Sequence, residues 1–143
     1  MSPRAASRLT QLGATEVYDY VGGKTDWLAH GLTYEGEAEL VGRHLHDVPT
    51  CTPDERIGAV AARPQIDSLC VVVGPGRVVL GTLDGHALTV DGDAVVAAVA
   101  RYGPTTVRPS EERSALEDRM EAKDVDHILV TDPAGRLLGA FRR

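Results

Sequence analysis

Apolar and polar residues follow one another along the first forty positions in a pattern that predicts a helix, a strand and a second helix. The first helix covers residues 3–12, the strand covers residues 16–21, and the second helix covers residues 23–29. A lone strand leaves both of its edges without hydrogen-bond partners, so this αβα fragment is not a complete domain. We expect it to borrow a sheet edge or to pack on another part of the chain.

Two stretches of the chain beyond residue 47 repeat one order of elements: strand, helix, strand, turn and strand. Pro53 and Pro109 lie 56 residues apart, and Gly81 and Gly139 lie 58 apart, so the two copies differ little in length. The first copy's strands are continuous apolar runs, which indicates a sheet that is covered on both faces. The strands are predicted at Leu69–Val73 and Arg77–Leu80 in the first copy, and at Ile128–Thr131 and Arg136–Gly139 in the second.

Start signals predict helices around these strands. Ser110 is the expected N-cap of a helix that reaches Ala122, and Asp93 is the expected cap of a helix over residues 94–101. A further short helix is predicted over residues 37–45. The pattern therefore predicts an α/β (α+β) fold, in which two tandem units with small sheets and flanking helices follow the αβα fragment. The predicted domains are residues 1–38 and 39–143, with the units at about 45–90 and 91–143.

Composition and charge restrict the classes of function. The 143 residues carry a formal net charge of -6 with acidic and basic residues interspersed, which argues against a nucleic-acid partner. The longest apolar run is far shorter than the roughly 20 residues that a membrane helix needs, so we expect a cytoplasmic protein without membrane contact. Cys51 and Cys70 have no CxxC motif around them, so we expect reduced structural thiols rather than a disulfide or a zinc site.

Short motifs mark the beginning and the end of the copies. The beginnings are Thr50–Asp54 (TCTPD) and Thr106–Ser110 (TVRPS), and the second copy closes with Asp126–Asp132 (DHILVTD) and Gly135–Gly139 (GRLLG). With these motifs, residues 45–143 resemble a pair of CBS (cystathionine-beta-synthase) domains, the Bateman module. The resemblance implies a regulatory module that senses an adenosine-containing ligand between its units, namely AMP, ADP, ATP or S-adenosylmethionine. It also implies a homodimer.

A second resemblance covers residues 2–36. Ser2–Ala6 (SPRAA), Val17–Lys24 (VYDYVGGK) and Asp26–Trp27 are similar to the C-terminal end of a rhodanese domain, as in the rhodanese and CBS fusions of actinobacteria. In that family, the loop with the catalytic cysteine directly precedes the SPRAA helix, which is where this sequence begins. Cys51 and Cys70 match no rhodanese position, so we expect no nucleophile for sulfur transfer and no enzyme. A remnant of a rhodanese-type sulfurtransferase is the weaker alternative.

The CBS resemblance also implies candidate nucleotide-binding residues. In that family a glycine and two apolar residues precede a hydroxyl residue, and a carboxylate follows three positions later. Here Asp84 stands at the hydroxyl position of the first unit and Ala87 at its carboxylate position. Asp84 would repel a phosphate but could accept a hydrogen bond from a ribose hydroxyl. Arg142 stands at the hydroxyl position of the second unit, where its planar cation could hold a phosphate. The other candidates from the cleft of that family are Thr50, Thr106, Asp126 and His127.

These departures leave a hypothesis from another class open. Changes at Asp84, Ala87 and Arg142 favour a ligand-free pair that serves as a dimerisation or partner-docking scaffold. Under that hypothesis the threonines only begin strands, and the adjacent Asp126 and His127 are surface residues.

Three further patterns predict no chemistry. The run Gly23–Thr25 is typical of the end of a phosphate-binding P-loop, but Tyr18 stands where the first glycine of that loop belongs. His44, His46 and Asp47 do not supply the three or four ligands in fixed geometry that a metal site needs, so we predict none. Alternating charges over residues 111–123 predict a solvated helix face with pairs at spacing i, i+4.

Overall fold

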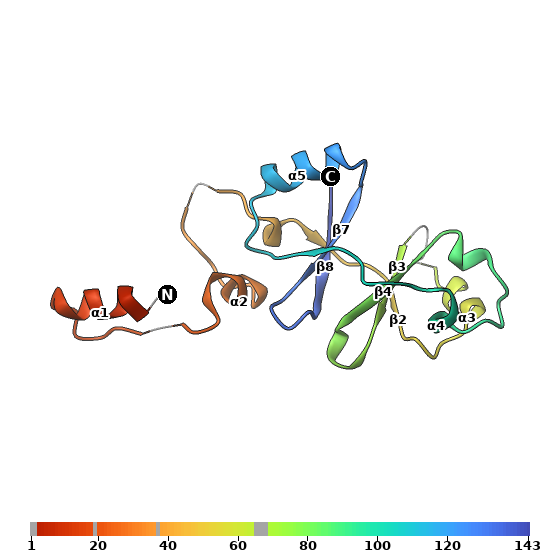
Figure 1. Ribbon diagram of the computed structural model, residues 1–143, viewed down its shortest axis with the longest axis horizontal. Helices are drawn as coiled ribbons and strands as arrows, with labels where there is room; N and C mark the ends of the chain where they lie inside the picture. The colour runs from red at the N-terminus through yellow and green to blue at the C-terminus, as the bar shows by residue number, and fades with distance from the viewer. Residues whose placement is uncertain (1–2, 19, 37, 65–68) are drawn as a thin grey trace.

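Each sequence copy folds around a small mixed sheet. In the computed structural model, which describes residues 3–18, 20–36, 38–64 and 69–143, the two units lie side by side along the length of the molecule (Figure 1). The predicted order of strand, helix, strand, turn and strand is found in both copies. The N-terminal helices lie at the end of the molecule that is next to the second unit (Figure 1).

The first sheet has the strand order β2-β3-β4-β5. Strand β2 is parallel to β3 because a helix connects them, while β3, β4 and β5 are antiparallel neighbours. The elements of this unit are β2 (Thr50–Cys51), α3 (Ile57–Ala61), β3 (Leu69–Val73), η2 (Pro75–Arg77), β4 (Val79–Asp84), η3 (Ala87–Thr89), α4 (Val96–Val99) and β5 (Arg101–Tyr102).

The second sheet takes one strand from a distant part of the chain. Its order is β1-β8-β7-β6, and Leu45 of β1 pairs with Phe141 of β8 although β1 precedes the whole first unit. The sheet pairing therefore crosses the predicted division between residues 90 and 91, while the division into two tandem units stays a prediction. The elements are η1 (Val41–Arg43), β1 (Leu45–His46), β6 (Thr106–Val107), α5 (Arg113–Ala122), β7 (His127–Thr131) and β8 (Leu137–Arg142).

Two closing segments, residues 39–46 and 94–102, play the same part in the two units. Each adds a short helix and an edge strand to a sheet. The backbone N–H of Val41 donates to the carbonyl of Glu111 at 3.0 Å, and that of Val96 donates to the carbonyl of Glu55 at 2.8 Å. The segment before the first unit therefore completes the second unit, and the segment after the first unit completes the first.

Two glycines allow the closing segments to approach the sheets. A Cβ atom on Gly81 would lie 2.7 Å from the carbonyl oxygen of Arg101 in β5, and one on Gly139 would lie 2.8 Å from the carbonyl oxygen of His46 in β1. Gly139 also has a φ of +155°, which favours glycine. These are the two glycines whose spacing reveals the repeat.

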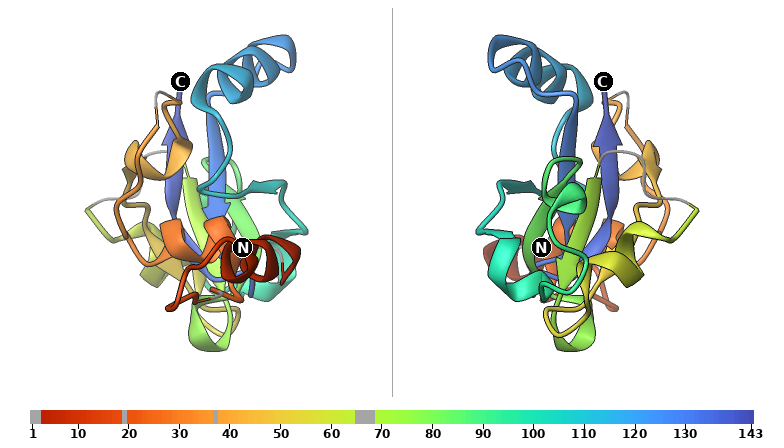
Figure 2. Two further views of the ribbon diagram at one scale, coloured as in Figure 1. Left: turned by 90° about the vertical axis from the view of Figure 1, so that its left-hand side faces the viewer. Right: turned by 90° about the vertical axis from the view of Figure 1, so that its right-hand side faces the viewer.

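The central strands face two cores. Cys70 and Val72 of β3 pack in a cluster with the helices of the first unit, whereas Val71 of β3 packs in a cluster that also contains Leu129 of β7 and Ala140 of β8. Figure 2 shows the two hairpins, β3–β4 in green and β7–β8 in blue, close together in the middle of the molecule. The prediction that both faces of the sheet are covered is confirmed, because helices cover one face and the other hairpin covers the second.

The N-terminal fragment differs from its prediction. Helices α1 (Pro3–Gln11) and α2 (Gly23–Ala29) form, but the strand predicted over residues 16–21 is wrong, since the described residues of that stretch are not in a strand. Asp19 lies outside the described residues. The ring of Tyr20 instead meets the ring of Trp27 edge to face at 5.4 Å, and the indole N–H of Trp27 donates to the carbonyl of Thr33 at 2.7 Å.

Several helix predictions are corrected by the backbone around them. The helix predicted over residues 37–45 is wrong: apart from residue 37, which lies outside the described residues, the stretch contains one turn, η1, and then enters β1. The helix predicted over residues 94–101 ends at Val99 because Arg101 belongs to β5. The side-chain caps predicted for Asp93 and Ser110 are also wrong, because carbonyls of the paired segments accept from the first N–H groups instead, as Glu39 does from Arg113 at 2.9 Å. No helix in the described residues is long and apolar enough to cross a membrane.

The exchanged closing segments generate a stability prediction. Val41→Ala and Val96→Ala each remove two methyl groups from a fully buried site and should each cost about 2 kcal/mol of unfolding free energy. In native-state hydrogen exchange, Val41→Ala should increase exchange in β6, β7 and β8, and Val96→Ala should increase it in β2, β3 and β4. Equal effects of Val41→Ala on both sheets would contradict the assignment of residues 39–46 to the second unit.

Candidate functional site

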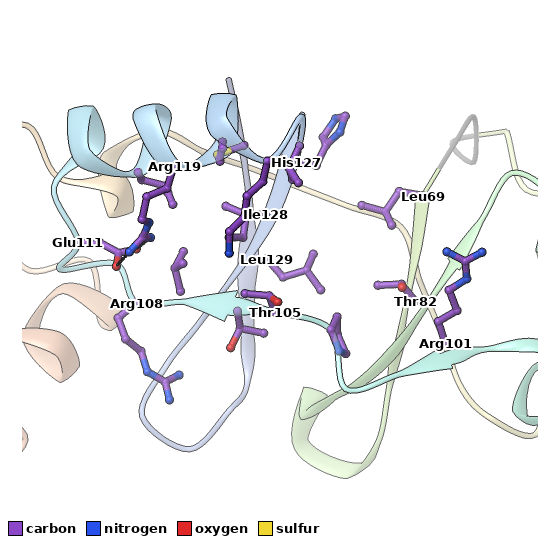
Figure 3. A pocket seen from close by; sticks show the side chains of 17 residues that line it. Leu69, Thr82, Arg101, Thr105, Arg108, Glu111, Arg119, His127, Ile128 and Leu129 are labelled. Atoms are coloured by element: carbon purple, nitrogen blue, oxygen red, sulfur yellow. Dashed lines mark hydrogen bonds and ion pairs between the residues drawn. The ribbon is translucent and has the colours of Figure 1, made fainter.

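A cleft with a volume of about 800 Å³ opens between the two units (Figure 3). Its volume lies within the range of small-molecule sites. The second unit supplies α5 and the first residues of β6 and β7, and the first unit supplies Leu69, Thr82 and Arg101 from β3, β4 and β5. The cleft exists because the two hairpins pack together at their turn ends, where the N–H of Val79 donates to the carbonyl of Gly135 at 3.0 Å.

Two of the residues predicted from the sequence line this cleft directly. Thr106 begins β6 and His127 begins β7, and both are half-buried. Parallel pairing of β6 with β7 brings these two strand beginnings to the same end of the sheet. They are supported by the apolar side chains of Ile128 and Leu129 on the same wall (Figure 3).

Asp84 reaches the cleft through another residue. Its Oδ2 atom lies 3.2 Å from Nη2 of Arg101, which lines the cleft, and its Oδ1 atom accepts the backbone N–H of Ala87 at 2.8 Å. The hydrogen bond from Ala87 lowers the pKa of the Asp84 carboxyl, and the positive charge of Arg101 acts in the same direction. The carboxylate is therefore shared between the first N–H group of η3 and the guanidinium of Arg101.

The other three predicted residues are not among those that line the cleft. The carbonyl of Thr50 accepts from Nη1 of Arg63 at 2.8 Å. Asp126 is exposed and its carboxylate lies 4.0 Å from Nη2 of Arg143. Arg142 is exposed at the end of β8, opposite His127 in the adjacent strand. Their part in ligand binding stays a prediction.

Positive charge gathers in the cleft although the chain carries a net charge of -6. Among the described residues that line it are four cations and one carboxylate, Glu111. Two of these cations lie in the run from 111 to 123, whose alternating charges predict a solvated face rather than a site. The cations are Arg101, Arg108, Arg119 and Lys123.

The four cations differ in what they contact. The guanidinium of Arg119 makes a two-pronged contact with Glu111, with distances of 3.1 Å and 2.8 Å. Nη1 of Arg108 donates to the carbonyls of Thr131 and Asp132, and Figure 3 shows this side chain turned away from the others. Lys123 has no side-chain hydrogen bond or ion pair with any described residue.

Both copies of the repeat contain a glutamate followed by an arginine at the same spacing. Glu111 and Arg119 are eight residues apart, and so are Glu55 and Arg63, which also form an ion pair in the first unit. Arg63 is additionally bonded to the carbonyl of Thr50. The pair is therefore a shared feature of both units, and comparison of the two copies could have found Arg119.

Two histidines lie together beside the cleft. The rings of His46 in β1 and His127 in β7 have centroids 6.0 Å apart. Burial lowers the pKa of the His46 imidazole, and the charges of His127 and Arg142 lower it further, against the opposing carboxylate of Asp47. Within the described ranges, His, Cys, Asp and Glu side chains form no group of three that could hold a metal ion.

Comparison with known proteins identifies the fold. No protein-family model and no curated protein matches the sequence. Solved structures do match: the CBS domains of a transcriptional regulator from Streptococcus pneumoniae have a TM-score of 0.66 at 17% identity, over 75% of this chain and 95% of that one. OpuCA of Staphylococcus aureus matches with a TM-score of 0.63 at 20% identity, over 72% of this chain and 90% of that one.

A third similar structure was solved with a ligand. The cytosolic domain of the Mg²⁺ channel MgtE in complex with ATP has a TM-score of 0.63 at 19% identity, over 73% of this chain and 47% of that one. The matched part thus spans about half the length of that protein. Together these similarities show that the chain has the fold of a CBS-domain pair, and the predicted fold class is confirmed.

The position of His46 generates a prediction on pH. In the unfolded chain His46 takes up a proton near its ordinary pKa of about 6.5, whereas the folded protein resists that proton until a lower pH. Protonation therefore favours the unfolded state, and stability should fall as pH drops from 7 to 5. Asp84 and Asp132, whose pKa values are lowered, lose their stabilising effect only below about pH 4.

Urea unfolding at pH 7 and pH 5 measures this effect. His46→Gln should show a smaller loss of stability between the two pH values than the wild-type protein. His86→Gln, at an exposed position of the first unit, is the matched control and should behave like the wild type. Identical pH dependence of His46→Gln and wild type would show that His46 is not responsible.

Proposed function

We propose that this protein is a non-catalytic regulatory CBS pair that binds an adenosine-containing ligand in the cleft between its units. AMP, ADP, ATP and S-adenosylmethionine are the ligands considered. The observation that supports the proposal best is the concentration of cations around a cleft of about 800 Å³ in a chain of negative net charge. A similar fold solved with ATP adds to that support.

The lining of the cleft suits the parts of such a ligand. Leu69 and Leu129 offer apolar surface for an adenine ring, and the hydroxyl groups of Thr105 and Thr106 are suitable partners for a ribose. The cations offer charge to a phosphate. Asp84 would act indirectly, because its carboxylate already holds Arg101 and the N–H of Ala87.

A catalytic role is not part of the proposal. Cys51 and Cys70 are both buried, with exposed fractions of 2% and 0%, so neither offers an accessible nucleophile. We propose that residues 1–38 are a rhodanese-like C-terminal fragment without sulfurtransferase activity. A homodimer and a cytoplasmic location complete the proposal, and light scattering of the purified protein measures the first of these.

A ligand-free docking scaffold is the second candidate function. One observation favours it: Asp84, at a position where related proteins are expected to present a ligand-binding hydroxyl, is committed to an ion pair with Arg101 and a hydrogen bond from the N–H of Ala87. In that case the cleft would stay without a nucleotide, and the pair would serve dimerisation or partner binding.

A thermal-shift panel with ATP, ADP, AMP, adenosine and S-adenosylmethionine tests the proposed function. A ligand present at about 100 times its dissociation constant adds about 2.7 kcal/mol of stability, which raises the melting midpoint of a chain of this size by several degrees. We expect a selective rise with at least one compound. No shift with any of the five at millimolar concentration would reject nucleotide sensing and favour the scaffold.

A further inference from the structure

We infer that the cleft selects nucleotides that carry phosphate, and that Arg119 of α5 and Lys123, the C-cap residue of that helix, hold the phosphate groups. This inference rests on the proposed function and narrows it, because S-adenosylmethionine is no longer among the expected ligands. It concerns residues that the family motifs do not assign, because Arg119 lies on α5 and Lys123 lies at the C-terminal end of that helix, outside the strand-end motifs.

The balance of charge supports selection against S-adenosylmethionine. Apart from Arg108, whose side chain is turned away, the cations of the cleft are Arg119, which is paired with Glu111, Arg101, which is paired with Asp84, and Lys123, which has no carboxylate partner among the described residues. The formal excess is therefore positive. S-adenosylmethionine carries a net positive charge, because its sulfonium and ammonium groups outnumber its one carboxylate, and like charges repel. A nucleotide phosphate would be attracted by the same excess of positive charge.

Local contacts indicate which cations are available. Arg108 donates hydrogen bonds to the carbonyls of Thr131 and Asp132, and Arg101 forms an ion pair with Asp84. Lys123 has no side-chain partner among the described residues and is exposed. An ammonium group of this kind can bind phosphate as a point charge.

Arg119 is oriented and still has donors to offer. It lies four residues before Lys123, the C-cap of α5, and both residues line the cleft. Its two contacts with Glu111 use two of the five N–H donors of a guanidinium, which leaves three for a ligand. Glu111 thus acts as a positioning residue that holds the fork of Arg119 at the cleft.

Calorimetric titration of the full chain with ATP, AMP, adenosine and S-adenosylmethionine tests the inference. AMP and ATP should bind at least about tenfold more tightly than the other two compounds. Lys123→Gln and Arg119→Gln should each weaken ATP binding by about five- to tenfold while the affinity for adenosine stays the same. Raising the salt concentration should weaken the binding of ATP but not that of adenosine.

Arg113→Gln is the matched control. Arg113 lies on the same helix and is also ion-paired, with its Nε atom 2.8 Å from Glu117, but it does not line the cleft. The Arg113→Gln variant should bind ATP with the same affinity as the wild-type protein. Thermal midpoints of all three variants without ligand verify that they are folded before titration.

The outcomes separate the inference from the function beneath it. If S-adenosylmethionine or adenosine binds as tightly as AMP, the CBS pair is still a nucleoside sensor, but selection for phosphate is wrong. Equal losses of ATP affinity in Arg113→Gln and Arg119→Gln would place the effect in the general field of the protein and overturn the assigned roles. If none of the four compounds binds, the proposed function itself fails.

Discussion

The packing of the two hairpins against each other is the contact on which the rest of the structure depends. Val71 and Val73 of one hairpin meet Leu129, Leu137 and Ala140 of the other in a layer from which water is excluded. Helices cover only one face of each four-stranded sheet. Neither sheet can bury its other apolar face without a partner. The two hairpins therefore cover each other's open faces. The burial of apolar surface between them holds the two units together.

The candidate site follows from this packing through the closing segments. The N–H of Gly42 donates to the carbonyl of Pro109 at 3.0 Å, and the N–H of Val41 donates to the carbonyl of Glu111 at the same distance. These bonds hold the loop that brings Arg108 and Glu111 to the cleft. A segment that precedes both units in the chain thus supports a wall of the cleft, which explains why the fold and the site cannot be assigned to separate pieces of sequence.

The helix starts show where local sequence rules were overruled. Ser110 has the side chain of an N-cap, but it contacts Thr25 of α2 through the two hydroxyl oxygens at 3.0 Å. The N–H groups at the start of α5 are satisfied from elsewhere, as the carbonyl of Glu39 demonstrates. A capping rule describes only the nearest residues in the chain. It cannot include a backbone acceptor that arrives from about seventy positions away.

Local sequence determined the repeat, the apolar central strands and the two glycines that admit the closing strands, because these depend on residue type and spacing. It also indicated Thr106 and His127 as cleft residues through a family resemblance, and both line the cleft. Only the tertiary structure decided which sheet β1 joins and which of the charged side chains face the cleft. Strand pairing depends on contacts between distant segments, and so does the placement of Arg101 and Lys123 around one cleft. No local pattern contains those contacts.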